Sequence, residues 1–278
     1  MVGFQVRDTA NDPGTPGRTG DDRFGYDQTA GTAWVFDGAT DVTPLKPFRG
    51  AESGAAWVAD ALSQRLMQAP LVTETAQSYW RRVLADVRAR AALDSDTSLG
   101  SLPPEAWPIA AGIWMRQVAA TDWEFAWFGD CLAIIAEPGV PGRLIGTPDK
   151  VEAESDSARA LMAMSHEARW ERLREERAAS NVAGYPIFGI NPDAVDALPV
   201  ARTTLASGTD VILLSDGLWR LVEPYGLYDL DGFVARVRDG GVSGAVADLR
   251  AFEAQSSEPR QDRVKARDDA CGVWLRTG

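Results

Sequence analysis

The sequence predicts an α+β layered sandwich that forms one domain over residues 1–278. Short apolar runs, which are typical of buried strands, are mixed with paired amphipathic helices, and the two do not alternate strictly as in a doubly wound fold. Hydrophobic residues make up 45% of the 278 residues, and ten residues are tryptophan. The chain therefore has enough apolar surface for a sizeable core without disulfides or a structural metal.

The first part of the chain contains a loop, a strand and two helices. Residues 11–20 are dense in Gly and Pro and predict a loop, and residues 33–36 predict a short buried strand. Apolar residues recur at helical spacing over 52–67 and over about 73–92. This spacing predicts two neighbouring helices.

The middle of the chain contains strands and then the most highly charged segment. Residues 109–118 and 123–135 predict paired strands, the second of which is interrupted by Gly129-Asp130. Opposite charges at three- and four-residue spacing in 151–179 predict a solvated helix. Residues 181–193 predict a loop.

The last part of the chain holds the clearest buried strand, at 211–215, which ends on Asp216-Gly217. Helical patterns follow over about 231–238 and 244–255. A polar loop then leads to a final strand at 271–276.

The composition excludes several classes of function. The net charge of −12 argues against nonspecific binding of nucleic acid or anionic lipid, because clustered Lys and Arg drive both. No run of eighteen or more apolar residues is present, and residues 1–12 lack the pattern of a signal peptide. The two cysteines, Cys131 and Cys271, lie in apolar runs and suit buried reduced thiols. We therefore expect a cytoplasmic protein that does not insert into membranes, and we expect a monomer.

Aspartates recur at predicted strand ends and in tight turns. They are Asp21-Asp22, Asp37-Gly38, Asp130, Asp216-Gly217 and Asp268-Asp269. Carboxylates that converge raise one another's pKa, so a cluster of them needs protons or cations for stability. Because the chain has one histidine and two cysteines, oxygen ligands and Mg²⁺ or Mn²⁺ are favoured over structural zinc. Two such ions about 3.5–4 Å apart can hold a bridging hydroxide and both ends of an in-line displacement, which is the chemistry of phosphate-ester hydrolysis.

Each of these motifs also has an ordinary structural explanation. A single Asp-Gly pair is more often a turn than a metal ligand. Asp37 and Asp216, however, each follow a buried apolar run, where a free carboxylate is costly unless it is coordinated. It is the set of motifs together that indicates a metal centre.

Five motifs occur in the order found in one phosphatase family. They are Gly20-Asp21-Asp22-Arg23-Phe24, Val35-Phe36-Asp37-Gly38, Phe128-Gly129-Asp130, Leu213-Leu214-Ser215-Asp216-Gly217-Leu218-Trp219 and Asp268-Asp269-Ala270. With them the chain resembles, over nearly its whole length, bacterial members of the PP2C (PPM) family of metal-dependent serine/threonine protein phosphatases. The resemblance implies two central antiparallel sheets flanked by pairs of helices, a four-layer α-β-β-α sandwich, with the metals at one end.

The resemblance also implies the roles of the site residues. Asp37 would bridge two Mn²⁺ or Mg²⁺ ions, Gly38 would offer its carbonyl, and Asp216 and Asp268 would complete the shell of one ion. The Asp21-Asp22 pair would supply a further carboxylate, directly or through water. The metal-bound hydroxide would attack the phosphorus of phosphoserine or phosphothreonine in a protein substrate.

The resemblance also bears on a third metal site and on the general acid. Asp130 matches the family position associated with a third, weaker metal. Many members of the family carry a histidine shortly after the Asp-Gly pair as a proposed general acid, whereas this chain continues Ala39-Thr40-Asp41, so the general acid is unassigned. His166, the only histidine, lies in the charged helical segment and is expected to be a surface or flap residue.

The phosphate-binding arginine is expected at Arg18. The family usually places it four residues before the acidic pair, where this chain has Gly17, and Arg18 is one residue nearer. The planar fork of arginine suits bidentate phosphate contact, so Arg18 is the expected phosphate-binding residue. Arg18 and Asp37 are the expected catalytic residues, and Arg23 is expected to be structural. The family also carries a variable flap, which corresponds here to residues 151–199 and is either a mobile lid or a packed insert.

Two other functions stay open at this point. One is a catalytically silent PP2C-like module that binds phosphoproteins or another partner, although its signature would be the loss of the metal carboxylates. The other is a hydrolase that acts on small phosphate esters.

Overall fold

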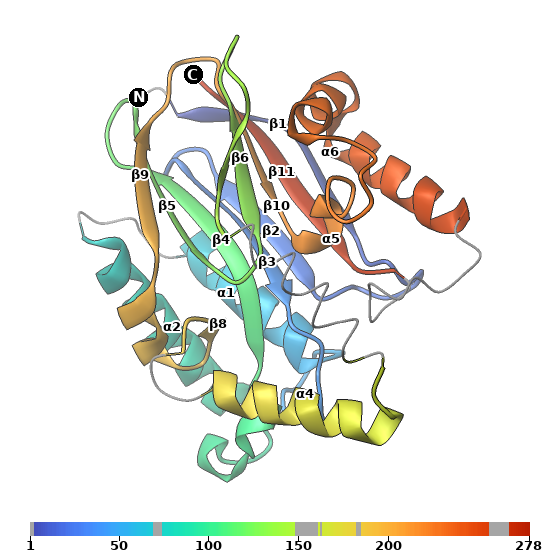
Figure 1. Ribbon diagram of the computed structural model, residues 1–278. Helices are drawn as coiled ribbons and strands as arrows, with labels where there is room; N and C mark the ends of the chain where they lie inside the picture. The colour runs from blue at the N-terminus through green and yellow to red at the C-terminus, as the bar shows by residue number, and fades with distance from the viewer. Residues whose placement is uncertain (1–2, 69–73, 148–160, 162, 182–184, 256–266) are drawn as a thin grey trace.

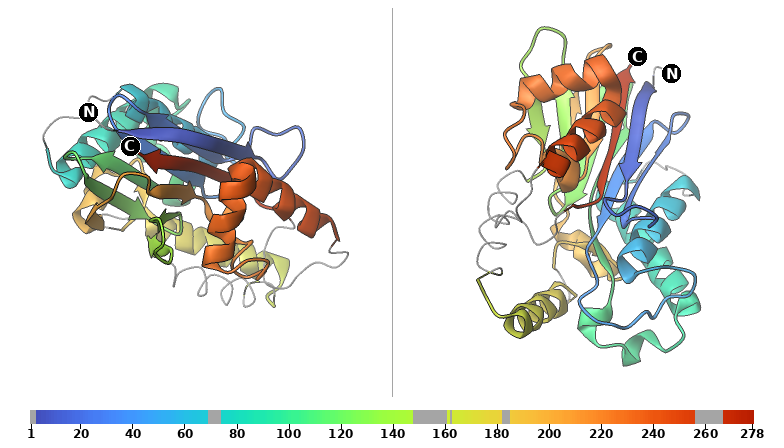
Figure 2. Two further views of the ribbon diagram at one scale, coloured as in Figure 1. Left: turned by 90° about the horizontal axis from the view of Figure 1, so that it is seen from above. Right: turned by 90° about the vertical axis from the view of Figure 1, so that its right-hand side faces the viewer.

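The computed structural model describes residues 3–68, 74–147, 161, 163–181, 185–255 and 267–278. Two antiparallel sheets pack face to face, and helices cover both outer faces (Figure 1). The side view in Figure 2 shows α6 on one side of the strands and α1 and α2 on the other. This arrangement confirms the predicted four-layer α+β sandwich.

The first sheet has the strand order β2-β3-β4-β5-β9, and β8 pairs with β4 off this path. Its strands are β2 (Asp22–Asp27), β3 (Thr32–Gly38), β4 (Ile109–Gln117), β5 (Asp122–Phe128), β8 (Phe188–Gly189) and β9 (Val200–Thr204). The helices α1 (Gly54–Gln68) and α2 (Ala76–Asp94) cover its outer face. Buried aromatic side chains, among them Trp34, Trp80 and Trp114, fill the layer between these helices and the sheet.

The second sheet has the strand order β1-β11-β10-β6-β7. Its strands are β1 (Phe4–Asp12), β6 (Leu132–Ala136), β7 (Arg143–Ile145), β10 (Asp210–Leu214) and β11 (Ala270–Thr277). The short helix α5 (Asp216–Trp219) and the long helix α6 (Leu230–Gln255) pack on its outer face. The inner faces of the two sheets share an apolar core that includes Val35, Ile113, Phe125, Ile135, Leu213 and Val273.

Helix α6 corresponds to the two helices that the sequence predicts in this region. The two halves meet at Gly241, whose φ of 74° is not helical. The second half begins next to Asp8 of β1, whose carboxylate accepts hydrogen bonds from the backbone N–H of Ser243 (2.9 Å) and from its hydroxyl (2.7 Å). A side-chain acceptor at a helix start satisfies one of the free N–H groups there.

Two of the predictions for individual segments are wrong. Residues 123–135 were expected to form one interrupted strand, but at Gly129-Asp130 the chain leaves β5 of the first sheet and enters β6 of the second. Residues 181–193 were expected to be a loop, but they contain β8 and the start of the 3-10 helix η3 (Pro192–Ala197). Strands β1, β2, β7 and β9 and the 3-10 helices η1 (Leu99–Ser101) and η2 (Pro104–Ala106) were not predicted individually.

The predicted insert 151–199 is partly described. Helix α4 (His166–Ser180) lies at the end of the sandwich away from the chain termini (Figure 1), and its location agrees with the predicted charged helix. Residues 151–160, 162 and 182–184 lie outside the described residues. Residues from 185 onward pack on α2, where Arg88 donates a hydrogen bond to the carbonyl of Ile190 (3.0 Å).

Two sequence-based expectations concern the cysteines and the membrane. Cys131 and Cys271 are both buried free thiols, as expected. Across the described ranges, no helix is both long enough and apolar enough to cross a bilayer.

Candidate metal centre

Carboxylates from both sheets meet at one end of the sandwich. β2 begins at Asp22, which lies directly opposite Asp37 near the end of β3. In the second sheet Asp216 follows β10, and Asp268 precedes β11, the antiparallel neighbour of β10. The charges of Asp216 and Asp268 act on both Asp22 and Asp37. The four side chains therefore form one cluster, although they come from three separate parts of the chain.

The carboxylates of this cluster raise one another's pKa. Asp22 has no exposed surface, and neither of its carboxylate oxygens has a hydrogen-bond partner among the described residues. Burial raises the pKa of Asp22 well above its ordinary value, and the charges of Asp269, Asp216 and Asp268 raise it further; the nearby Ser215 hydroxyl lowers it. That hydroxyl is engaged with the backbone of Cys271. Asp22 is thus held as a buried acid whose charged form lacks stabilisation.

Asp37 has a similar environment. Burial is the largest cause that raises the pKa of its carboxyl group well above the ordinary value, followed by the charges of Asp22 and Asp216. Two facing carboxylates of this kind either keep a proton or take up a cation. At neutral pH a divalent ion would relieve both effects at once.

The glycines that follow Asp37 and Asp216 are required by close backbone packing. A Cβ atom on Gly38 would lie 2.5 Å from the carbonyl oxygen of Ala55, at the start of α1. A Cβ atom on Gly217 would lie 1.9 Å from the carbonyl oxygen of Asp269. Only glycine lets the backbone approach this closely, so the Asp-Gly pairs draw the cluster together as well as supplying its carboxylates.

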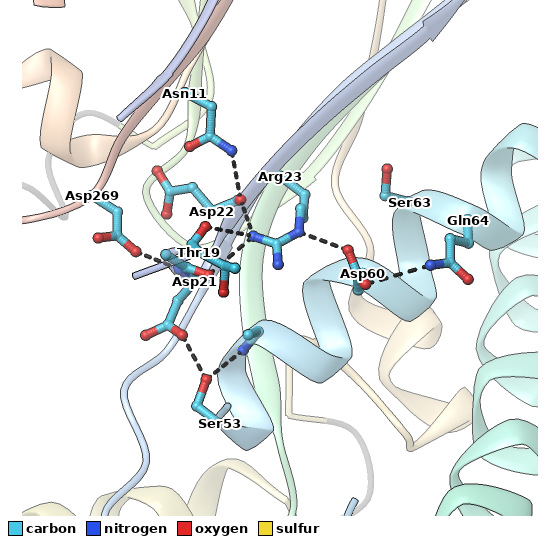
Figure 3. A network of polar contacts seen from close by, with 12 residues as sticks. Asn11, Thr19, Asp21, Asp22, Arg23, Ser53, Asp60, Ser63, Gln64 and Asp269 are labelled. Carbon is cyan, nitrogen blue, oxygen red and sulfur yellow. Dashed lines mark hydrogen bonds and ion pairs between the residues drawn. The ribbon is translucent and has the colours of Figure 1, made fainter. Parts of the chain in front are cut away.

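The side chains of Asp21 and Asp22 point in opposite directions, because successive side chains of a strand point to opposite faces. Figure 3 shows the Asp21 side chain pointing toward α1 while Asp22 points the other way. The Ser53 hydroxyl donates a hydrogen bond to Asp21 (2.6 Å), and the Asp21 N–H donates to the carboxylate of Asp269. Of the pair, Asp22 is therefore the residue that enters the cluster directly.

Arg18, the expected phosphate-binding residue, lies beside the cluster. It lines a pocket of about 430 Å³ together with Asp21, Asp269 and Arg267. Its side chain is 54% exposed and forms a loose ion pair with Glu52 (3.6 Å). Arg267 was not singled out from the sequence, although its position directly before the Asp268-Asp269 pair was a usable signal.

Arg23 is bound into the structure, in agreement with its expected structural role. Its guanidinium donates hydrogen bonds to the carbonyls of Gly20 (3.0 Å) and Asp22 (2.7 Å) and pairs with Asp60 (2.7 Å), as Figure 3 shows. These contacts hold the loop that leads into β2. Arg23 thus positions the acidic pair from the side of α1.

Asp130 lies at the crossover between the sheets. Gly129 has a φ of +77°, a conformation that glycine adopts without strain, and the turn buries Asp130. Burial raises the pKa of the next residue, Cys131, and the charges of Asp37, Asp130 and Asp22 raise it further, in that order. Asp130, Asp22 and Asp37 therefore all lie near Cys131.

The insert reaches the site through Arg177 of α4, a residue that the sequence did not single out. Arg177 is 7% exposed and donates hydrogen bonds to the carbonyls of Ala39 (3.2 Å) and Thr40 (2.9 Å). These residues directly follow the Asp37-Gly38 pair. His166, at the other end of α4, is exposed and accepts a hydrogen bond from Trp170 (3.0 Å), as expected for a surface residue.

Arg220 is the third basic residue of the site that was not singled out from the sequence, after Arg267 and Arg177. Its Nη2 atom donates a hydrogen bond to Asp268 Oδ2 (2.6 Å) and lies 3.9 Å from Asp216 Oδ2. Burial alone would lower the pKa of the guanidinium, but the charges of Asp268 and Asp216 outweigh it and raise the pKa. The four-residue spacing from Asp216 was the available signal, since such residues share one face of a helix.

The donor chemistry of the cluster fits a hard divalent ion. Asp216 Oδ1, like both oxygens of Asp22, is buried without a hydrogen-bond partner in the described part of the chain, and carboxylate oxygens are the ligands that Mg²⁺ and Mn²⁺ prefer. As the side chains stand, no three His, Cys, Asp or Glu residues among those described are arranged to hold an ion. Asp268 is held by Arg220 and Asp21 by Ser53, so a metal would have to draw side chains toward Asp22 and Asp37.

Comparisons with known proteins identify the fold. No protein-family model matches the chain, and no curated protein matches it. Solved structures match over the whole length. PppA of Pseudomonas aeruginosa, described as a key regulatory component of T6SS, is 16% identical, with a TM-score of 0.57 and coverage of 100% of this chain and 99% of that chain.

Two further matches are phosphatases. The catalytic domain of the serine/threonine protein phosphatase PstP, in complex with two manganese ions, is 12% identical, with a TM-score of 0.57 over 100% of this chain and 99% of that chain. The PPM Ser-Thr phosphatase MsPP of Mycobacterium smegmatis is 18% identical, with a TM-score of 0.51 over 98% and 99%. The chain therefore has the fold of the PP2C (PPM) serine/threonine phosphatases, which confirms at the level of the fold the resemblance that its motifs predict.

Proposed function

We propose that this chain is a metal-dependent phosphatase that hydrolyses phosphoserine and phosphothreonine in proteins. The observation that carries the proposal is a set of buried carboxylate oxygens, on Asp22 and Asp216, that have no hydrogen-bond partners among the described residues and lie at one end of a phosphatase fold. Unpartnered buried charges are expensive to maintain. Their presence is best accounted for by cations that bind there and take part in the function.

Each residue of the cluster has a role in this proposal. Asp22 and Asp37 would hold Mn²⁺ or Mg²⁺ between them, with the carbonyl of Gly38 as a further donor, and Asp216 and Asp268 would complete the ligand set. Bound ions of this kind lower the pKa of coordinated water and neutralise charge on the phosphate. Asp21 would contribute through water, because its carboxylate is engaged by a serine hydroxyl, and Asp130 is the candidate for a third, weaker ion.

The pocket beside the cluster would receive the phosphate group. Arg18 and Arg267 line it from two different segments, next to Asp21 and Asp269. Arginine presents a planar fork of donors that matches phosphate oxygens, and these two side chains would hold the dianion that the carboxylates would otherwise repel. Water then displaces the serine or threonine hydroxyl at phosphorus, and the products are free alcohol and inorganic phosphate.

The test is hydrolysis of para-nitrophenyl phosphate by the purified protein with Mn²⁺, Mg²⁺ or EDTA. We expect activity that needs the metal and that Asp37→Asn and Asp216→Asn abolish. Asp86→Asn is the matched control, because Asp86 pairs with Arg65 on the surface of the helices (2.6 Å). Phosphoserine and phosphothreonine peptides, compared with small phosphate esters, would then separate a protein phosphatase from an enzyme of small metabolites.

A catalytically silent binding module is the second candidate, because no three ligands converge on one point among the described residues. It differs from the first in a measurable way. A folded protein that binds a phosphopeptide but releases no phosphate with either metal would support the silent module and contradict the phosphatase.

A further inference from the structure

Arg220 is the basic side chain that makes direct contact with the carboxylates of the cluster in the described residues. It follows the single turn of α5, and its backbone N–H donates a hydrogen bond to the carbonyl of Asp216 (3.0 Å). This turn brings the guanidinium back over the face that carries Asp216. Its side chain is 14% exposed, so water and salt screen its charge only weakly.

The guanidinium engages one half of the cluster, which we call the arginine-paired half and which consists of Asp216 and Asp268. Asp268 Oδ2 accepts a hydrogen bond from Arg220 (2.6 Å), and Asp268 Oδ1 accepts one from the N–H of Asp269 (3.2 Å). Both oxygens of Asp268 are therefore already in use. The Nη1 atom of Arg220 is buried and has no acceptor in the described ranges. The guanidinium therefore lies where its charge stabilises the two carboxylates, although one of its nitrogens makes no hydrogen bond with the described residues there.

The other half of the cluster consists of Asp22 and Asp37, and we call it the open half. Both oxygens of Asp22 are buried and have no hydrogen-bond partner in the described part of the chain, and no arginine is among the main influences on the pKa of either residue. The cluster thus combines Asp22, which has no hydrogen-bond partner among the described residues, with Asp268, which Arg220 already holds. Asp216 lies between these cases, because its Oδ2 is 3.9 Å from Arg220 and its buried Oδ1 has no partner in the described ranges.

We propose that Arg220 is a built-in counter-ion for Asp216 and Asp268, so that the protein holds one divalent ion tightly at the open half and binds a second only by displacing the guanidinium. Arginine stays protonated at every pH that the protein meets, so its competition with metal does not depend on pH. A Mg²⁺ ion needs its carboxylate oxygen at about 2.0–2.1 Å. Both oxygens of Asp268 already accept hydrogen bonds, one of them from Arg220, so a metal ion bound by Asp268 must compete with the guanidinium.

The inference rests on the proposed metal centre but is tested without substrate. Mn²⁺ is titrated into metal-free protein by isothermal titration calorimetry, with the parent, Arg220→Met and Arg236→Met compared. Arg236→Met is the matched control, because Arg236 is a partly buried arginine of α6 whose ion pair is with Asp248 and not with the cluster. We expect one tight ion in the parent and in the control, and in Arg220→Met a second ion that binds at least about tenfold more tightly than in the parent.

Unchanged stoichiometry and affinity in Arg220→Met would overturn the inference, and so would two equally tight ions in the parent. If Arg220→Met does not fold, a Mn²⁺-bound crystal structure of the parent decides the question. One ion with the bond from Arg220 to Asp268 intact supports the inference, and two ions with that bond intact refute it. If the parent binds no Mn²⁺ at all, the proposed function and the tight site at the open half are both refuted, and a gain of binding in Arg220→Met would then support only the counter-ion role of Arg220.

Discussion

Replacing Asp22 with asparagine is expected to stabilise the metal-free protein. The side chain has no exposed surface and no hydrogen-bond partner on either oxygen in the described ranges, and other carboxylates surround it. A buried polar group without a partner costs about 1–3 kcal/mol, and a charged one costs more. Asparagine keeps the shape and is itself a buried polar group, so it removes only the charge and its repulsion from the other carboxylates. Above the folded pKa, each unit by which the pKa is raised costs about 1.4 kcal/mol, so the free energy of unfolding in EDTA should rise by at least about 1 kcal/mol, or about 2–4 °C in Tm for each kcal/mol.

The pH dependence gives this prediction a sign that can be checked. The folded protein raises the pKa of Asp22 and Asp37 above the ordinary value of 3.8, so above about pH 4 the folded state binds more protons than the unfolded chain. In the metal-free parent, the contribution of these two groups to stability should therefore be largest in acid and be lost as the pH rises through their folded pKa. Asp22→Asn should lose less stability over the same range.

Metal should reverse the order of stability. A hundredfold excess of Mn²⁺ over its dissociation constant stabilises a protein by about 2.7 kcal/mol, and the parent should gain an amount of this kind. The variant lacks a ligand and should gain little. The same substitution is thus expected to help the metal-free protein and to harm the metal-bound one.

The assay is urea unfolding followed by tryptophan fluorescence, in EDTA and in Mn²⁺, for the parent, Asp22→Asn and Asp86→Asn. Asp86 is 46% exposed and pairs with Arg65, and surface substitutions of this kind change stability by about 0.5 kcal/mol or less. The reasoning is refuted if Asp22→Asn is less stable than the parent in EDTA while Asp86→Asn is unchanged. Equal protection of parent and variant by Mn²⁺ would refute the metal role of Asp22.

Three further predictions follow from the same site. Arg18→Ala should raise the KM for para-nitrophenyl phosphate about tenfold with little change in Tm, because the side chain is half exposed; an unchanged KM would exclude phosphate contact. Gly217→Ala should destabilise the protein by about 3 kcal/mol or more, because its Cβ would meet the carbonyl of Asp269 at 1.9 Å. Gly100→Ala should not, because its Cβ would meet only the Ser98 hydroxyl at an ordinary contact distance of 3.8 Å, and urea unfolding would show the difference. Arg177→Met should expose α4 to limited proteolysis without unfolding the sheets, because it removes two hydrogen bonds that anchor that helix; cleavage at the parent rate would contradict this anchoring.

Sequence reasoning identifies the strands in which nearly every residue is apolar and buried. β10 is buried at every position and β3 at all but one, so an apolar run is visible before any partner is known. β1 has one buried residue and β9 has none, and their other residues are half-buried or exposed. They are strands because they pair with β11 and β5, and pairing between distant segments leaves no local signal in one sequence.

The same distinction applies to the candidate site. Asp37 and Asp216 could be predicted because each stands at the end of an apolar run, where an acid is unexpected, whereas Asp22 and Asp268 were identified from the order of the motifs. The choice between Asp21 and Asp22 could not, because it depends on the faces of β2, which was itself not recognised. Arg177 was missed for a different reason: it contacts a loop about 140 residues earlier in the chain.

Arg220 shows most clearly why spacing alone does not assign a role. An acid and an arginine four residues apart are usually a solvated helix pair that contributes about 0.3–0.5 kcal/mol, and the chain has such a pair at Arg172 and Glu176. Arg220 and Asp216 have the same separation, but their side chains are 14% and 18% exposed and Asp268 lies against them. Burial makes the charge of an arginine act on every nearby carboxylate. The approach of β11 to β10 therefore turns an ordinary surface spacing into a competitor for metal.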